Sequence, residues 1–238
     1  MNFTTLLLLQ ILAHFLADYT FQNDKKASDK NKKGFKSKFL KWHILIVFVL
    51  SWLLSFQLKF VFASLIIAFS HWLIDGFKPK LNKGKYSFFI DQFLHLSILT
   101  IVTYLYVEKF GISDLPFAIP KKLLLIILAF YLTEKPTNIF IREIFRLYKI
   151  KFNVVKNELL NAGKLIGIIE RWLILLFVFL NQYEAIGFLI AAKSILRYNP
   201  NNDTENFNKT EYVLVGTMLS FFIAIFLGTI AKLLIEKI

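Results

Sequence analysis

Residues 3–22 read FTTLLLLQILAHFLADYTFQ, an apolar run that also contains one histidine and one aspartate. A helix that crosses a bilayer needs about 20 predominantly apolar residues, so this run is long enough. Similar apolar segments recur along the chain, and they predict an all-α fold, a polytopic bundle of about eight transmembrane helices. The expected spans are 3–22, 41–58, 60–77, 86–107, 120–134, 164–182, 184–198 and 211–233. The fifth and seventh are short for full crossings.

The composition of the whole chain also indicates a membrane protein. Of the 238 residues, 56% are hydrophobic, while the formal net charge is +13. Soluble domains contain about 45–50% apolar residues even when glycine is counted. A chain that is both apolar and basic must keep its charges apart from its spans. The absence of cysteine excludes disulfides, thiolate zinc sites and iron–sulfur clusters.

The basic residues gather in three of the connections between the expected spans. Residues 23–41, 78–85 and 135–164 have net charges of +6, +4 and +5. The positive-inside rule places these basic loops in the cytoplasm, with both termini outside a bacterial inner (cytoplasmic) membrane. Segment 137–150 has apolar residues at helical spacing and basic residues between them, which predicts an amphipathic helix at the cytoplasmic interface.

We expect a single integral membrane domain, 1–238, with three parts. Its first part, 1–107, contains four spans and all four histidines. A connector, 108–163, contains the interfacial helix, and 164–238 adds a three-helix part.

The four histidines form a pattern with three aspartates. Three histidines stand four residues from an aspartate, a spacing that puts both side chains on one helix face. The pairs are His14 with Asp18, His71 with Asp75, and His95 with Asp91, and His43 lies near the start of the second span. In the expected topology all seven side chains lie at one depth, near the cytoplasmic side. Ionisable groups within a span cost about 2.5–3.5 kcal/mol each on insertion scales and usually mark a functional site.

Imidazole and carboxylate groups together suit a divalent metal ion. Zinc fits best, with manganese or iron as alternatives. Seven ligands exceed one tetrahedral site, so the pattern allows one ion or two. Some of the aspartates would instead orient a histidine ligand by hydrogen bonding. The alternative is a structural or proton-relay network without a metal.

The later spans carry ionisable groups that suggest a substrate pocket. Arg171, Lys193 and Arg197 are candidates for binding a phosphate or carboxylate, and Glu170 and Asp91 are candidate catalytic bases. The alternative is that the basic side chains extend from helix ends to the interface and that Glu170 forms a salt bridge.

Five stretches resemble a known bacterial membrane family. They are LAHFLADYTFQ (12–22), SHWLIDGFK (70–78), IDQFLHL (90–96), AGKLIGIIERWLILLFVFLNQYEAIGFLIAAKSILRY (162–198) and TEYVLVGTMLSFFIA (210–224). The family is catalogued as domain of unknown function 3307, and the resemblance spans nearly the whole chain. It implies a bacterial polytopic membrane protein and no particular activity. The His-x-x-x-Asp layout is also similar to inner-membrane proteins described as metal-dependent hydrolases, but this likeness covers only the ligand pattern.

Three functions follow as hypotheses. The first is a membrane-embedded metal-dependent hydrolase that acts at the cytoplasmic face on a lipid- or isoprenoid-type phosphate or ester. The alternative is a proton- or metal-coupled transporter or channel that uses the same residues. A third is a membrane anchor whose Lys-rich segment 23–41 recruits a partner. This segment lacks arginine, so we expect contact with anionic lipids and no nucleic-acid binding. The sequence does not indicate an oligomeric state.

Overall fold

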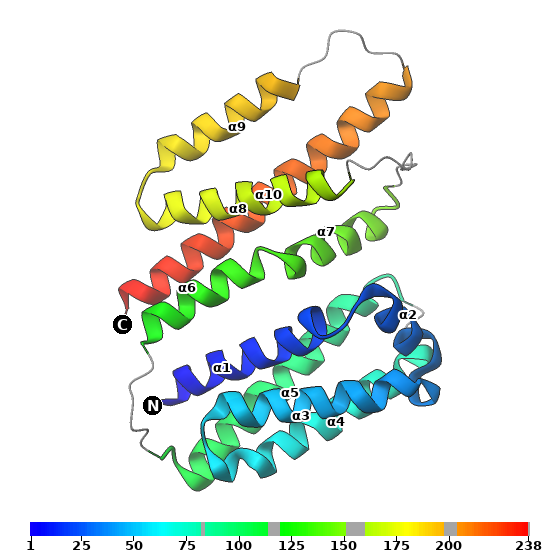
Figure 1. The fold of residues 1–238 in the computed structure, drawn as a ribbon, viewed down its shortest axis with the longest axis vertical. Helices are drawn as coiled ribbons and strands as arrows, with labels where there is room; N and C mark the ends of the chain where they lie inside the picture. Colours follow the sequence, from blue (N-terminus) through cyan, green and yellow to red (C-terminus); the bar gives the residue numbers. More distant parts are fainter. Residues whose placement is uncertain (82–83, 114–119, 151–159, 198–203, 238) are drawn as a thin grey trace. The chain divides into compact units, whose positions relative to one another are not determined.

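The computed structural model describes residues 1–81, 84–113, 120–150, 160–197 and 204–237 (Figure 1). These residues are mainly helical and contain no strand, which confirms the all-α class. The chain divides into two compact units, Met1–Leu124 and Leu125–Ile238, which we call unit 1 and unit 2. Each of the eight expected spans corresponds to a helix. The prediction of one membrane domain with three parts stays a prediction.

As far as the structure describes it, unit 1 is a bundle of four long helices with a short polar helix at one end (Figure 1). Each long helix packs against two others, in the cyclic order α1, α3, α4, α5. The elements are α1 (Phe3–Phe15), the π-helical turn η1 (Leu16–Thr20), α2 (Asp24–Lys33), the 3-10 turn η2 (Gly34–Lys36), α3 (Lys38–Ser55), the 3-10 turn η3 (Leu58–Phe60), α4 (Val61–Leu81) and α5 (Ser87–Phe110).

Local sequence signals explain where these helices begin and end. The Asn2 side chain accepts a hydrogen bond from the backbone N–H of Thr5, and Asn23 does the same for Lys26, so both asparagines are N-caps. Helix α2 ends at Gly34, whose φ of +53° favours glycine. Helix α3 ends at Phe56, which also has a positive φ, of 52°.

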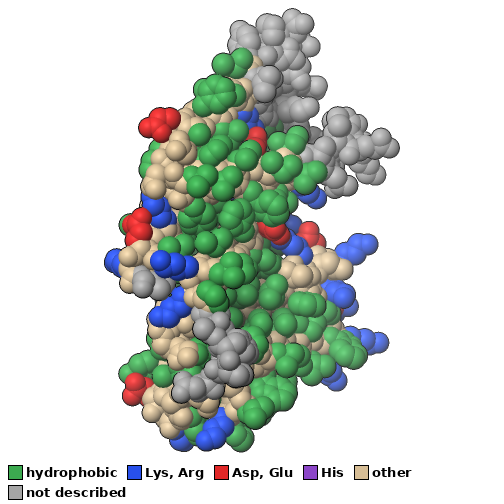
Figure 2. Space-filling model, turned by 60° about the vertical axis from the view of Figure 1, so that its left-hand side comes forward, with side chains coloured by type: hydrophobic (Ala, Val, Ile, Leu, Met, Phe, Trp, Pro, Cys, Tyr) green, Lys and Arg blue, Asp and Glu red, His purple; other side chains and the backbone are tan. Residues whose placement is uncertain are grey.

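The apolar residues of unit 1 divide between a small core and an exposed surface. The core includes Leu6, Val47 and Phe60, each at most 3% exposed. Large apolar side chains on the outside of the bundle are exposed, such as Trp42, which is 66% exposed, and Phe93, which is 70% exposed. Figure 2 shows hydrophobic side chains spread over the face that it draws. A soluble protein rarely exposes so much apolar surface, so this surface is compatible with a membrane protein.

The expectation that 23–41 is a basic loop is wrong for most of its length, because α2, η2 and the start of α3 occupy it. The segment packs on α4 at a close backbone approach. A Cβ atom on Gly34 would lie 2.3 Å from the carbonyl oxygen of Gly76, and one on Gly76 would overlap the Phe35 ring. Two glycines therefore let the polar segment fold back onto the bundle. The expected loop 78–85 is also partly wrong, since α4 continues through Pro79 to Leu81.

In its described residues, unit 2 contains five helices, the first of which begins just before the unit boundary. They are α6 (Lys121–Leu132), α7 (Lys135–Leu147), α8 (Leu160–Phe179), α9 (Tyr183–Arg197) and α10 (Thr204–Glu236). Ile174 and Val178 of α8, Ile186 of α9 and Phe221 of α10 form the core among the last three helices. The amphipathic helix expected at 137–150 is present as α7, and its Phe145 is buried. Its location at a membrane interface stays a prediction.

Among the described residues, five segments are long and apolar enough to cross a membrane: Phe3–Thr20, Lys38–Ser55, Leu58–Lys80, Ser87–Phe110 and Tyr212–Glu236. Helices α6 and α7 meet at a bend of 43° and would make a sixth crossing if they form one broken span. Helix α9 has 15 residues, fewer than a full crossing needs. The expected count of eight is therefore not confirmed among the described residues, and the orientation in the membrane stays a prediction.

Candidate metal centre

The seven side chains predicted as metal ligands come together inside unit 1. They come from all four long helices and the π-helical turn, and none is more than 8% exposed. The residues are His14, Asp18, His43, His71, Asp75, Asp91 and His95. The structure thus brings residues together that are up to 81 positions apart in the chain, from His14 to His95.

Asp18 is the hub of one side of this cluster. Its Oδ1 lies 3.1 Å from His43 Nε2 and 3.3 Å from His71 Nε2. Its Oδ2 lies 4.0 Å from His14 Nε2 and accepts a hydrogen bond from Gln92 Nε2 at 3.4 Å. Asp18 belongs to the π-helical turn η1, a local widening of the helix that is common at functional sites. Imidazoles from three helices therefore surround this carboxylate.

Asp75 is the hub of the other side, and its partners include two lysines. Lys30 Nζ lies 2.7 Å from Asp75 Oδ2, and Lys78 Nζ lies 2.8 Å from Asp75 Oδ1. Lys78 Nζ also lies 2.9 Å from Asp91 Oδ2, so it bridges two carboxylates. His95 Nε2 lies 3.5 Å from Asp91 Oδ1 and 3.8 Å from Asp75 Oδ1.

The four imidazole rings form one contiguous group between these carboxylates. The His71 and His95 rings are stacked, with centroids 3.8 Å apart and planes 24° apart. The centroid of His14 lies 5.3 Å from that of His71, and the centroid of His43 lies 5.2 Å from it. Two stacked imidazolium ions would repel each other, so the arrangement disfavours protonation of both His71 and His95.

Several buried polar atoms in the cluster lack a hydrogen-bond partner among the described residues. They are His14 Nε2, both ring nitrogens of His43, His95 Nε2, Asp75 Oδ1 and Asp91 Oδ1. Buried polar groups are normally paired, and leaving one unpaired costs about 1–3 kcal/mol. The ion pairs of Asp75 and Asp91 compensate part of this cost electrostatically. His43 Nε2 and His95 Nε2 also face carboxylate oxygens, at 3.1 and 3.5 Å, but without the geometry of a hydrogen bond.

The geometry of the ligand atoms is compatible with a metal ion. Three groups each bring their ligand atoms within 4.8 Å of one another: His14, Asp18 and His71; His43, His71 and Asp75; and Asp75, Asp91 and His95. All the donors are nitrogen or oxygen, which suits zinc, manganese or iron. The residues can therefore hold a divalent ion.

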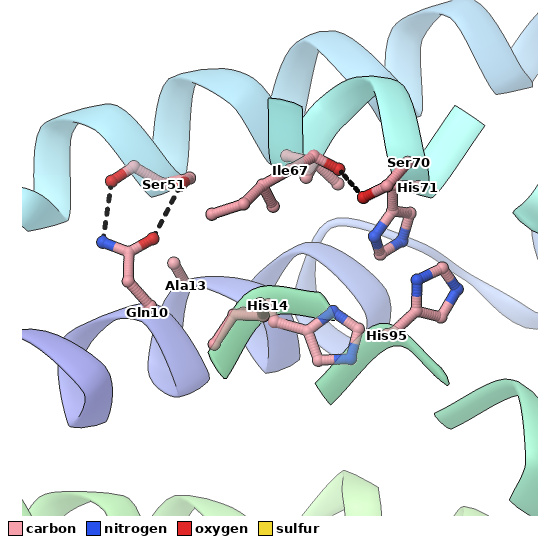
Figure 3. A pocket seen from close by; sticks show the side chains of 10 residues that line it. Gln10, Ala13, His14, Ser51, Ile67, Ser70, His71 and His95 are labelled. Atoms are coloured by element: carbon pink, nitrogen blue, oxygen red, sulfur yellow. Dashed lines mark hydrogen bonds between the residues drawn. The ribbon is translucent and has the colours of Figure 1, made fainter. Parts of the chain in front are cut away.

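A small cavity adjoins three of the histidines (Figure 3). His14, His71 and His95 line one end, and Gln10 and Ser51 line the other. Gln10 Nε2 donates to the Ser51 carbonyl at 3.0 Å, and Ser51 Oγ donates to Gln10 Oε1 at 2.6 Å. The cavity has room for about one water molecule.

The sequence analysis missed Lys30 and Lys78, because it assigned both to basic loops. Lys30 is only 1% exposed, and the Lys78 side chain is 14% exposed. A signal for Lys78 was present: it follows Asp75 by three residues, a spacing at which side chains on one helix meet. No comparable signal marks Lys30, since its contact depends on the fold-back of α2 onto α4.

The residues predicted for substrate binding lie in unit 2. Lys193 of α9 forms an ion pair with Glu170 of α8. Arg171 is 2% exposed. The side chain of Arg197 lies outside the described part of the chain. The roles of Glu170 as a base and of these three cations in substrate binding stay predictions.

Arg171 donates to three protein oxygens in unit 2. Its Nε donates to the Thr133 carbonyl at the bend between α6 and α7. Its Nη1 donates to Ser220 Oγ at 2.9 Å, and its Nη2 donates to Asn138 Oδ1 at 2.9 Å. The guanidinium therefore connects α7, α8 and α10 with the α6–α7 bend.

Comparison with known proteins identifies a family but no activity. No curated protein and no solved structure matches the chain. A family model matches residues 6–132, which include every residue of the histidine and aspartate cluster. The match ends before the two C-terminal stretches, so the resemblance there stays a prediction. Since the match covers more than half of the 238 residues, the chain belongs to the family described as protein of unknown function, DUF3307.

Proposed function

We propose that this protein is a membrane-embedded metalloprotein that hydrolyses a lipid- or isoprenoid-type phosphate or ester. The observation that carries the proposal is the set of buried imidazole nitrogens without hydrogen-bond partners among the described residues, next to three carboxylates. A divalent ion beside Asp18 would give His14 Nε2 the partner that it lacks. Zinc is the best match to a nitrogen and oxygen site, and manganese and iron are alternatives.

The chemistry would use a metal-activated water. A bound zinc ion lowers the pKa of its water ligand to about 7, which supplies a hydroxide nucleophile near neutral pH. His14, Asp18 and His71 would hold the ion, and Asp91 would accept a proton from the nucleophile or deliver one to the leaving group. Lys78 fixes the Asp91 carboxylate by its ion pair at 2.9 Å.

A lipid-type substrate fits the surroundings of the site. Unit 1 exposes large apolar side chains along its helices, while α2 and the start of α3 carry exposed lysines near the cluster. Basic residues near a membrane surface attract anionic headgroups by about 1 kcal/mol each. We place this end of unit 1 on the cytoplasmic side, in keeping with the positive-inside rule.

Turnover by the purified protein tests this proposal. We would load the protein with zinc or manganese and assay a panel of lipid phosphates and lipid esters in mixed micelles. Hydrolysis should require the metal and should fall at least about 100-fold in His71→Ala, since metal-ligand loss removes the nucleophile. Phe69→Ala is the matched control, because Phe69 lies on the same helix but is 58% exposed. Metal-loaded protein that hydrolyses no member of the panel would reject the hydrolase and leave the metal site standing.

A second candidate, a proton- or metal-coupled transporter, is favoured by buried polar residues beyond the cavity. Gln10, Ser51 and Ser64 are each at most 2% exposed, and Ser51 Oγ lies 3.2 Å from Ser64 Oγ. They extend the polar interior from the histidines toward the other end of the bundle. Flux of protons or zinc into proteoliposomes, abolished by Gln10→Leu with unchanged metal content, would favour transport over hydrolysis.

A further inference from the structure

We infer that the centre holds a single divalent ion, on the Asp18 side, and that the ammonium groups of Lys30 and Lys78 occupy the place of a second ion. This inference rests on the proposed metal site. It proposes that two lysines determine how many ions bind and where they bind. Two-metal hydrolytic sites use carboxylates to bridge ions about 3.5–4 Å apart. A cluster with three aspartates could hold two ions in this way, so the binding of a single ion requires an explanation.

The Asp75 side already contains its cations. Lys30 and Lys78 each contact one oxygen of Asp75, at 2.7 and 2.8 Å. Lys78 also reaches Asp91 at 2.9 Å, so its nitrogen lies between the two carboxylates of the third ligand group. An ion placed there would meet an ammonium group at short range, and like charges at such distances repel strongly in a low-dielectric interior.

The Asp18 side contains ligands and no competing cation. Among the described residues, no lysine or arginine nitrogen lies within 4.0 Å of Asp18. Its neighbours are three imidazoles and the side-chain amide of Gln92, and Nε2 of His14 has no hydrogen-bond partner in the part of the chain that the structure describes. His14 Nε2, His71 Nε2 and the Asp18 carboxylate form the ligand group left for an ion.

The formal charge of the site also favours one divalent ion over two. Counted without the imidazoles, three carboxylates and two ammonium groups leave one negative charge in a buried site. One divalent ion turns this into one positive charge, whereas two ions would leave three positive charges. Two ammonium groups and one divalent ion carry equal charge, so removal of both lysines makes room for a second ion without changing the total.

The fold holds the lysines in place, which distinguishes them from mobile surface lysines. Lys30 is on α2, whose following turn packs on α4 where Gly34 meets Gly76. The only described acidic partner of Lys30 is Asp75, and its side chain is 1% exposed. Lys78 follows Asp75 on α4 itself. Both ammonium groups are therefore positioned by helix packing.

Metal content measured by mass spectrometry after equilibration with zinc tests the inference. The test variant is Lys30→Met with Lys78→Met, which keeps most of the side-chain volume and removes both charges. The matched control is Lys32→Met with Lys80→Met, which removes two exposed lysines from the same helices. We expect one zinc per chain in the wild-type protein and the control, and two in the test variant. Zinc should also raise the melting temperature of the test variant more than that of the wild type.

The outcomes separate this inference from the proposed function. Two ions in the wild type, or one in a folded test variant, would overturn the inference and leave the metal site in place. No ion in the wild type would reject the metal site itself. If the test variant fails to fold, single variants still decide: Asp91→Asn should keep one ion and Asp18→Asn should lose it. Loss of the ion in Asp91→Asn with retention in Asp18→Asn would overturn the inference.

Discussion

Unit 1 and unit 2 both bury charged side chains among helices, but they pair them in different ways. In unit 2 the guanidinium of Arg171 donates to three neutral oxygens, from Thr133, Asn138 and Ser220. In unit 1 the carboxylates meet lysines and imidazoles, and several imidazole nitrogens have no hydrogen-bond partner among the described residues. The hydrogen bonds of Arg171 can be explained as a structural connection between helices. An incompletely paired network at the same degree of burial leaves nitrogen and oxygen atoms that a metal ion could bind.

Asp75 is the residue whose loss should damage unit 1 most. Asp75→Leu leaves the buried Lys30 unpaired and Lys78 with one carboxylate instead of two. Removal of one partner from a buried ion pair costs about 3–5 kcal/mol. We expect the free energy of unfolding in detergent micelles to fall by that amount. Glu108→Gln, at an exposed position of α5, is the control. A loss below about 1 kcal/mol would show that the lysines find other partners.

Gly34→Ala tests whether close packing holds the lysine-bearing segment. The new Cβ would lie 2.3 Å from a backbone oxygen of α4, at a residue with φ of +53°. The left-handed conformation costs a non-glycine residue about 1–2 kcal/mol, and the clash adds to this. We expect a loss of about 3 kcal/mol together with weaker protection of α2 from hydrogen exchange. Gly84→Ala, where a Cβ meets open space, should change little. Equal effects of the two substitutions would contradict the packing account.

Much of the fold could be predicted from hydrophobic periodicity and length. The eight apolar segments are helices, because a run of about 20 apolar residues has few other solutions. The seven ligand candidates in unit 1 could also be predicted, since ionisable groups at one depth on neighbouring helices must meet or remain unpaired. The spacing of four residues within each pair predicts that both side chains lie on one face of their helix.

The lysines and the number of crossings could not be predicted, for a physical reason. A count of charges treats each lysine between spans as solvent-exposed, yet Lys30 lies within a helix that folds back onto the bundle. That contact depends on two glycines 42 residues apart, Gly34 and Gly76, which no local pattern connects. Crossing number likewise depends on bends, such as the 43° angle between α6 and α7.

Arg171→Met should weaken unit 2 without changing the metal content. It removes the donors to Thr133, Asn138 and Ser220, and hydrogen bonds to charged groups are worth about 1.5–3 kcal/mol each before partners re-pair. We expect a net loss of about 2 kcal/mol. Arg146→Met is the control, because its ion pair with Glu143 is at the surface and 74% of its side chain is exposed. A change in zinc stoichiometry of Arg171→Met would contradict a purely structural role.

The smallest effect should come from Asp29, which connects α2 to the start of α3. The ion pair with Lys33 and the hydrogen bond from Ser37 Oγ lower the pKa of Asp29 below its usual value of 3.8. A lowered folded-state pKa stabilises the fold above the unfolded pKa, and this contribution disappears as pH falls through the folded value. The melting temperature of Asp29→Asn should therefore lie slightly below that of the wild type at pH 6. The two should converge well below pH 3.8. A difference that persists unchanged in acid would exclude this ion pair as its cause.

X-ray absorption at the zinc edge of the purified, zinc-equilibrated protein tests the central claim most directly. The account predicts one zinc per chain with only nitrogen and oxygen neighbours at about 2.0–2.2 Å and imidazole scattering, since the chain has no cysteine. In His14→Ala the number of imidazole ligands should fall by one or the zinc should be lost, whereas Phe69→Ala should leave the spectrum unchanged. A wild-type protein without zinc, or a spectrum that His14→Ala does not alter, would contradict a metal site at this cluster.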